Sequence, residues 1–264
     1  MKHALLPNGV SLSYVDQGAG DTVVLLHGFC GSSAYWQYVI PALAEQYRVI
    51  APDLRGHGVS SVPQEPYSIE EMADDIALLL AELDISKAAL FGHSLGGYIT
   101  LAFAEKHQNR LVGFSLIHSM AYPDSEEAKA NRTKAAESIR EHGMEPFIKT
   151  LVPKLFAPAH LETMEDKVRL AKEIGLKTPR LGAMNTLAAM RDRPDRNQVL
   201  ENTLVPILLL AGSEDQIIPA EKTFSVDLPH ITQQKLEGVG HMGMYESPDQ
   251  LLAGMKAFLD KVYW

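Results

Sequence analysis

The sequence has little cysteine and no long apolar run, and both absences narrow the class of protein. Its 264 residues include one cysteine, Cys30, which cannot form an intramolecular disulfide. A disulfide-stapled scaffold is therefore excluded. The longest apolar runs, residues 76–81 and 207–211, are far shorter than the roughly 18 residues of a membrane span. The apolar start of the chain is also too short for a signal peptide, so we expect a cytoplasmic protein without a membrane span.

The chain also has fewer basic residues than acidic residues. The chain carries 24 Lys and Arg against 33 Asp and Glu, a net charge of −9 that would repel a phosphate backbone. We therefore expect a small-molecule substrate and no nucleic acid as partner. Hydrophobic residues make up 46% and charged residues 22%, which is typical of a globular domain with one large core. The oligomeric state cannot be predicted from these features.

Short apolar runs bounded by turn residues predict β-strands. They span residues 12–15, 23–26, 48–51, 88–91, 113–117, 207–210 and 234–236. Most of the runs from residue 23 onward are continuously apolar, as in parallel strands that are covered on both faces. Helical stretches lie between them, and one of these begins with a capping box at Ser68 and Glu71. The alternation predicts an α/β fold, and the first two runs, too close for an intervening helix, predict an antiparallel start.

One connection is much longer than a crossover requires. About 90 residues separate the runs that end near residue 117 and begin near residue 207, where a dozen or more would suffice. The excess is rich in Lys, Glu, Met and Ala, which indicates several helices. We interpret residues 122–194 as a helical cap inserted into a core formed by residues 1–121 and 195–264. The cap contains 13 Lys and Arg and 11 Asp and Glu, so the acidity of the chain belongs to the core.

A candidate nucleophile lies in the pentapeptide Gly92-His93-Ser94-Leu95-Gly96. It stands between a predicted strand and a predicted helix, where a sharp turn can hold Ser94 above the sheet. Gly92 and Gly96 would avoid collisions at that turn. This is the pattern of a nucleophile elbow, although a glycine-rich turn with an incidental serine fits the pentapeptide alone.

A serine nucleophile needs a base and an acid that orients the base. His241 follows a predicted strand within a glycine-rich loop, and Asp215 directly follows another. Glu214 and Asp124 are alternatives to Asp215. Four further histidines also lie near strand ends: His27, His57, His93 and His118. The order Ser94, Asp215, His241 places three groups at the carboxyl ends of three strands, where reactive groups of open parallel sheets gather.

Metal and nucleotide sites have weaker support. No pair of histidines has the spacing of a helical zinc motif, and His27 with Cys30 has no second pair to complete a site. The segment 28–33 lacks the lysine of a P-loop. We therefore expect neither a metal nor a cofactor.

Together these motifs resemble the α/β-hydrolase fold superfamily, in particular its cap-bearing serine hydrolases. His27-Gly28-Phe29 is similar to the oxyanion loop of that family, residues 53–60 to its Asp-x-Arg-Gly-x-Gly-x-Ser loop, and residues 211–219 to its acid loop. The resemblance implies a mostly parallel eight-stranded sheet with helices on both faces. It also implies an oxyanion hole formed by the backbone N–H groups of Phe29 and Leu95, with Gly28 in the loop.

The resemblance further implies a serine esterase that cleaves a small ester through an acyl-enzyme. Apolar residues of the cap and of the loop that carries His241 (residues 238–242, the histidine loop) are candidates for the substrate pocket: Phe156, Met184 and Met242. The same triad would also serve C–C bond, thioester or lactone hydrolysis or perhydrolysis. A weakly catalytic receptor for a small ligand is the alternative from another class.

Overall fold

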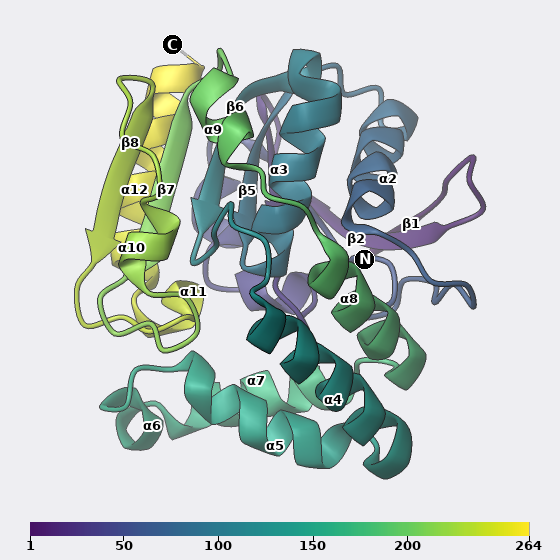
Figure 1. Cartoon of the computed structure of the whole chain (residues 1–264). Helices are drawn as coiled ribbons and strands as arrows, with labels where there is room; N and C mark the ends of the chain where they lie inside the picture. The colour runs from purple at the N-terminus through teal and green to yellow at the C-terminus, as the bar shows by residue number, and fades with distance from the viewer. Residues whose placement is uncertain (264) are drawn as a thin grey trace.

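The computed structural model describes residues 1–263, and its centre is an eight-stranded sheet with the order β1-β2-β4-β3-β5-β6-β7-β8 (Figure 1). The strands are β1 (Lys2–Leu5), β2 (Ser11–Gln17), β3 (Thr22–Leu26), β4 (Arg48–Pro52), β5 (Ala88–His93), β6 (Leu111–Ile117), β7 (Ile207–Gly212) and β8 (Ile231–Leu236). Strands β3 to β8 pair in parallel, so the predicted α/β fold with a mostly parallel sheet is confirmed.

The sheet starts with antiparallel strands as expected, but the strands that pair are not the predicted ones. Strand β2 pairs antiparallel with β1 and with β4, and not with β3, which follows it in the chain. The edge strand β1 was not among the predicted runs, because Ala4 is its one buried residue. Strand β3, in contrast, is buried at all of its positions. Continuous burial is what produces a recognisable apolar run.

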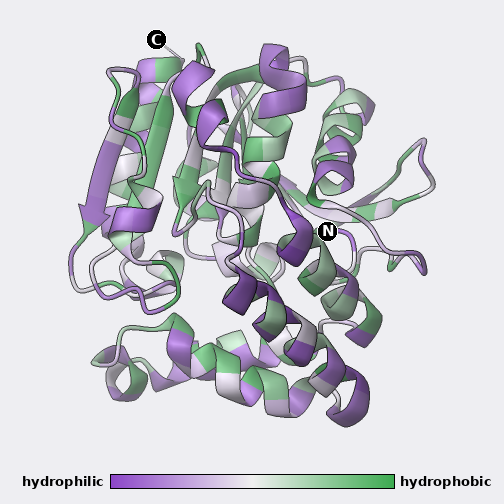
Figure 2. Cartoon of the chain, viewed as in Figure 1, coloured by the Kyte–Doolittle hydropathy of each residue, from purple (hydrophilic) through white to green (hydrophobic). Residues whose placement is uncertain are grey.

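Helices cover both faces of the sheet (Figure 1). A side chain at Gly92 of β5 would overlap Thr100 of α3 (Leu95–His107), whereas the neighbouring Phe91 contacts Phe258 of α12 (Pro248–Val262). Adjacent residues of a strand point to opposite faces, so α3 and α12 lie on opposite sides of the sheet. The central strands β5 and β7 are mostly hydrophobic, whereas the edge strand β8 is largely hydrophilic (Figure 2).

The predicted capping box forms at the start of α2 (Ile69–Glu82). The Ser68 hydroxyl accepts the Glu71 N–H at 3.2 Å, and the Glu71 carboxylate accepts the Ser68 N–H at 2.9 Å. The remaining core helices are α1 (Ile40–Leu43), α9 (Asn197–Asn202), α10 (Ala220–Thr223) and α11 (Gly243–Glu246). Two 3-10 turns, Ser33–Trp36 and Gln108–Arg110, complete the core. Among residues 1–263, no helix combines the length and the apolar character that crossing a membrane requires.

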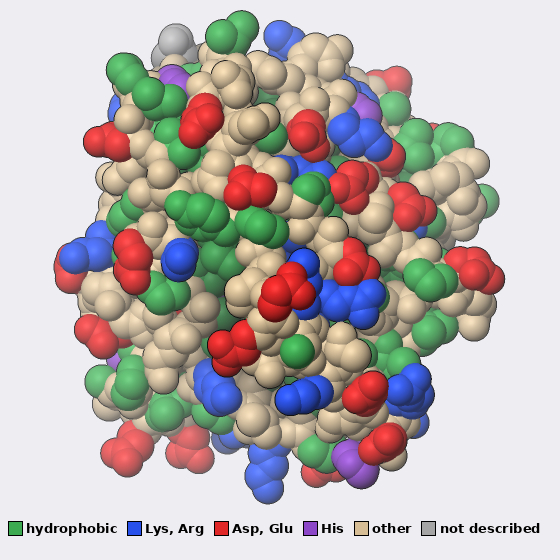
Figure 3. Space-filling model, in the orientation of Figure 1, with side chains coloured by type: hydrophobic (Ala, Val, Ile, Leu, Met, Phe, Trp, Pro, Cys, Tyr) green, Lys and Arg blue, Asp and Glu red, His purple; other side chains and the backbone are tan. Residues whose placement is uncertain are grey.

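Five helices follow β6 and lie across the carboxyl edge of the sheet (Figure 1). They are α4 (Glu126–His142), α5 (Met144–Leu155), α6 (His160–Thr163), α7 (Glu165–Leu176) and α8 (Arg180–Asp192). Side chains of both charge signs are mixed over these helices on the face in Figure 3. All five fall within residues 122–194, which we keep as the proposed extent of the cap.

Candidate active site

Ser94 occupies the sharp turn between β5 and α3, with φ of +51° and ψ of −112°. A non-glycine residue in this region is strained, and such strain persists where the surrounding structure enforces it. A Cβ at Gly92 would overlap the Gly96 carbonyl, and one at Gly96 would overlap the Leu26 carbonyl. The two glycines therefore let the turn close tightly, as the sequence pattern predicts.

His241 and Asp215 meet beside this turn. The His241 Nδ1–H donates to Asp215 Oδ2 at 2.7 Å, which leaves Nε2 of the neutral ring with a lone pair. Asp215 Oδ1 accepts the backbone N–H groups of Ile217 and Ile218 at 2.8 and 2.9 Å. Burial raises the pKa of Asp215, but its interactions with His241 and His118 outweigh burial and hold that pKa well below its usual range. The carboxylate is therefore ionised and its orientation is fixed by three donors.

Two backbone donors lie next to the serine. A Cβ at Gly28 would come within 3.3 Å of Ser94 Cβ, so the loop that carries Phe29 packs directly against the turn that holds Ser94. Within the described residues 1–263, neither the Phe29 nor the Leu95 backbone N–H donates to a protein acceptor. Leu95 is the first residue of α3, whose N-terminal N–H groups have no acceptor within the helix.

A second histidine, His118, also contacts the carboxylate. Its Nδ1 lies 3.4 Å from Asp215 Oδ2, and its Nε2 accepts the Gly243 N–H at 3.3 Å. His118 is fully buried and has φ of +48°. The ligand atoms of His118, Asp215 and His241 lie within 4.8 Å of one another, a grouping compatible with a metal ion. Hydrogen bonds already occupy these atoms, and the expectation of no metal stays a prediction.

The other histidines near strand ends support loops. His93 Nε2 donates to the His241 carbonyl oxygen at 2.8 Å, so it braces the histidine loop. His27 Nε2 accepts the Leu54 N–H at 3.0 Å. Burial lowers the pKa of His27 to about 4 and that of His57 to about 3, so both rings are neutral at pH 7. Cys30 is buried too, and burial raises the pKa of its thiol.

Ser94 and His241 line one cavity of about 90 Å³ at the junction of the sheet and the five helices. The other lining residues are Phe29, Tyr35, His93, Tyr98, Arg132, Leu151, Leu155, Met190 and Ile217. The three expected pocket residues lie elsewhere. Phe156 and Met242 are fully buried in the hydrophobic core, and Met184 lines an outer groove between α4 and α8. The apolar character of a residue does not show whether its side chain faces a cavity, the core or the surface.

The alternative acids are not beside His241. Asp124 accepts hydrogen bonds from Arg132 and Arg193, at 2.6 Å between Oδ1 and Arg193 Nη1. Glu214 is exposed to solvent. Of the three acid candidates, the structure therefore brings only Asp215 to the histidine.

Sequence reasoning missed Glu246, which joins the histidine loop to the helices above it. Its Oε1 accepts the Gly240 and Met242 N–H groups at 3.0 and 3.1 Å, and its Oε2 accepts the Ala157 N–H at 2.8 Å. His160 Nδ1 also lies 2.7 Å from Oε2. A carboxylate that spans two chain segments gives no local signal in the sequence, because its partners are set by tertiary packing.

A serine at a strained strand-to-helix turn, a His–Asp pair at neighbouring strand ends and a helical layer above them define a hydrolase built on a doubly wound sheet. Comparison with known proteins agrees. The family model for the alpha/beta hydrolase fold matches residues 21–248. The chain therefore belongs to the α/β-hydrolase fold family, and the predicted family and hydrolase class are confirmed.

Several relatives are similar over most of the chain. A thermophilic esterase from Thermogutta terrifontis, solved with malate bound, has 31% identity and a TM-score of 0.96 over 100% of both chains. A 3-oxoadipate enol-lactonase from Acinetobacter baylyi is 26% identical over 98% of this chain and 97% of its own. The acetyltransferase component of an acetoin-cleaving system from Pseudomonas putida is 33% identical over 92% of this chain. The aligned region covers 64% of that relative's length.

Proposed function

We propose that the protein is a serine hydrolase that cleaves a small ester or lactone through an acyl-enzyme. Ser94 Oγ attacks the carbonyl carbon while its proton passes to His241 Nε2, and Asp215 stabilises the imidazolium. The Phe29 and Leu95 N–H groups stabilise the oxyanion. The proton then passes to the departing oxygen, and water activated by His241 releases the acid.

One observation carries this proposal. Ser94, in its strained turn, shares a cavity with a histidine whose Nδ1–H is held 2.7 Å from a buried carboxylate. This hydrogen bond selects the tautomer that accepts a proton at Nε2. The free N–H groups of Phe29 and Leu95 add donors where the negative charge would develop.

The size of the cavity favours short substrates. Its volume of about 90 Å³ is well below the roughly 300–1,000 Å³ of sites for drug-sized ligands. We therefore expect acetate and butyrate esters to be preferred over octanoate and palmitate. The enol-lactonase among the relatives favours including a lactone in the substrate panel. Because the Thermogutta esterase was solved with malate bound, the panel also includes monoesters of dicarboxylic acids.

Kinetics with p-nitrophenyl acetate, butyrate, octanoate and palmitate, together with a thioester, a lactone and a monoester of a dicarboxylic acid, test the proposal. We expect Ser94→Ala to lower kcat/KM on the best substrate by about 10⁴-fold or more. The circular dichroism spectrum should be unchanged, which excludes loss of the fold. Full activity in a folded Ser94→Ala variant would refute the mechanism, and a maximum at palmitate would refute the size preference.

A further inference from the structure

Arg132 is a charged residue in an otherwise mostly apolar cavity. It projects from α4 and lines the cavity together with Ser94 and His241. Of the described lining residues, Arg132 is the one with a permanent charge. Burial lowers the pKa of the neighbouring His93, so this ring is neutral at pH 7. The Arg132 side chain is 22% exposed and pairs with Asp124, so the question is what the rest of its guanidinium binds.

The hydrogen bonds of Arg132 leave one side of its guanidinium available. Asp124 accepts from Nε and, at 3.3 Å, from Nη2, so the carboxylate occupies that edge. The remaining nitrogen, Nη1, lies 3.5 Å from the sulfur of Met190. A thioether is a weak acceptor, and no carboxylate or carbonyl oxygen of the described residues accepts from Nη1; the Tyr98 hydroxyl, which also lines the cavity, interacts with Arg132.

Asp124 is also shared with a second arginine. Arg193 Nη1 donates to Asp124 Oδ1 at 2.6 Å and to the Met190 carbonyl at 2.7 Å. The guanidinium carbon of Arg193 lies 3.9 Å from the ring centroid of Tyr98, a lining residue of the cavity. Two guanidinium groups therefore share one carboxylate, which leaves an excess positive charge at the cavity wall. Among residues 1–263, Asp124 is the one carboxylate that forms an ion pair with Arg132.

We propose that Arg132 binds a carboxylate of the substrate, so that the ester or lactone hydrolysed at Ser94 is an anion. This inference rests on the proposed function. The planar fork of a guanidinium matches a carboxylate, and pairing inside a small cavity strengthens the interaction. Because the cavity holds only about 90 Å³, the carboxylate must lie a few bonds from the scissile carbonyl.

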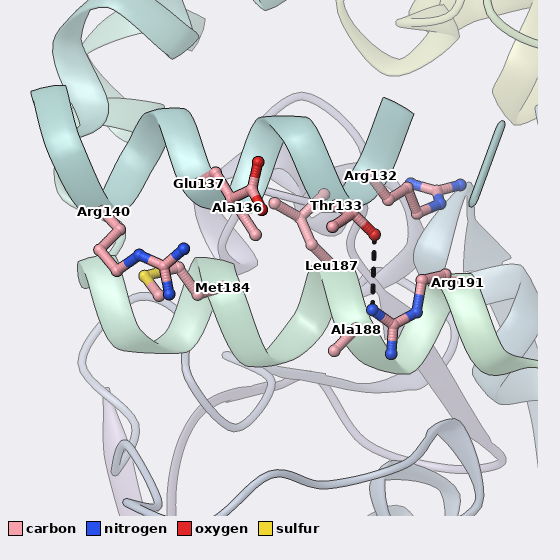
Figure 4. Close-up of a pocket in the computed structure, with 9 residues that line it drawn as sticks. All are labelled: Arg132, Thr133, Ala136, Glu137, Arg140, Met184, Leu187, Ala188 and Arg191. Atoms are coloured by element: carbon pink, nitrogen blue, oxygen red, sulfur yellow. Dashed lines mark hydrogen bonds between the residues drawn. The ribbon is translucent and has the colours of Figure 1, made fainter. Parts of the chain in front are cut away.

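The chain also offers a matched control. Arg132 lies at one end of the groove of about 220 Å³ between α4 and α8, and Arg140 of the same helix lies at the other end (Figure 4). Arg140 lines this groove and is absent from the residues that line the Ser94 cavity. Substituting glutamine at either position makes the same change in net charge on the same helix.

Two pairs of isosteric esters test the proposal, each followed by pH-stat titration at pH 7. Monoethyl succinate and ethyl 4-methylpentanoate differ in a carboxylate on the acyl side. Acetoxyacetate and isobutyl acetate differ in a carboxylate on the alcohol side. We expect the wild-type protein to prefer the anion in one of these pairs, and that pair identifies the side on which the carboxylate lies.

We expect Arg132→Gln to lower kcat/KM for the preferred anion by about 100-fold, the usual size of a hydrogen-bonded charge contact. The loss for its neutral isostere should be at least tenfold smaller. Arg132→Lys should keep part of the preference, because the charge remains and the fork is lost. Arg140→Gln should leave both rates within about twofold, since its charge is exposed and screened.

Two results would overturn the proposal: hydrolysis of the neutral esters with no preference for either anion, or an equal loss on both members of a pair in Arg132→Gln. If the wild-type protein hydrolyses none of the esters faster than the Ser94→Ala variant does, the proposed function is refuted. Calorimetry with succinate then tests Arg132 separately. Succinate binding that Arg132→Gln abolishes and Arg140→Gln preserves supports the carboxylate site, and absence of succinate binding refutes it.

Discussion

Two aspartates follow consecutive strands and are equally buried, yet their partners differ in kind. Asp215, after β7, has a side chain that is 0% exposed and pairs with His241 and His118. Asp124, after β6, is 2% exposed and pairs with Arg132 and Arg193. Burial raises the pKa of both carboxyl groups, and in both the cationic or imidazole partners outweigh it. Burial alone therefore does not define the role of a carboxylate, whereas its partners do.

The imidazole partners of Asp215 suit it to proton transfer, whereas the guanidinium partners of Asp124 suit it to holding positive charge. An imidazole accepts and releases a proton near neutral pH, so Asp215 is placed to orient a base. A guanidinium stays charged, so Asp124 is placed to anchor cations beside the cavity. If the two carboxylates differ in this way, substitution of Asp215 should affect catalysis most, and substitution of Asp124 should affect stability most.

The largest expected effect is that of Asp215→Asn on catalysis. An amide at this position favours the wrong tautomer of His241, and kcat on a neutral short ester should fall by about 10⁴-fold. Asp124→Asn is the matched control, and steady-state kinetics on the same ester should show a loss at least a hundredfold smaller. Comparable losses of kcat in the two folded variants would show that Asp215 and Asp124 do not have different roles in catalysis.

Stability should show the opposite ranking. Asp124→Asn leaves Arg193, whose side chain is 2% exposed, without its carboxylate, and breaking such a pair costs about 3 kcal/mol of unfolding free energy. Asp215→Asn leaves imidazoles that can lose their charge, so its cost should be smaller. Urea unfolding monitored by circular dichroism measures both values, and a more costly Asp215→Asn would contradict the comparison.

A smaller effect is expected at His118, the second imidazole on Asp215. His118 Nδ1 lies 3.4 Å from Asp215 Oδ2 and helps to hold the pKa of Asp215 low, so its removal destabilises the ionised carboxylate, and His118→Asn should lower kcat roughly tenfold. KM should change little, because His118 does not line the cavity among the described residues. A change in KM with kcat intact would indicate a packing role instead.

The last prediction concerns pH and distinguishes the buried histidines from the two aspartates. Burial holds the pKa of His57 at about 3, so the folded state stays neutral while the unfolded state takes up a proton below about 6.5. Stability therefore falls as the pH drops from about 6.5 toward 4, by at most about 1.4 kcal/mol per pH unit for each such histidine. The lowered pKa values of Asp124 and Asp215 remove stability only below the ordinary aspartate pKa of about 3.9.

Urea unfolding between pH 4 and pH 7 tests the histidine contribution. His57→Gln removes one of the buried imidazoles and should give a shallower loss of stability in this range than the wild-type protein. Identical slopes would mean that His57 does not take part in this linkage.

Much of the fold could be predicted, because a strand covered on both faces must be apolar throughout. This condition holds for β3, β5 and β7, where every residue is buried. It fails for the edge strands. In β8 only Ile231 and Leu236 are buried, so the predicted strand began three residues too late.

The candidate site could be predicted only where sequence position determines spatial position. Ser94, Asp215 and His241 follow parallel strands, whose ends share one edge of the sheet. Arg132 lies on a helix that crosses above that edge, and its direction depends on how α4 packs against α8. The same dependence explains why Met184 faces the outer groove and not the cavity.

The most direct test of the account is covalent labelling of the nucleophile. A fluorophosphonate should add one adduct to the intact protein, located by mass spectrometry to Ser94 within the tryptic peptide of residues 88–106. Labelling should be much slower in Asp215→Asn and close to the wild-type rate in Asp124→Asn. A folded protein that takes no label, or takes it on another residue, would contradict the account.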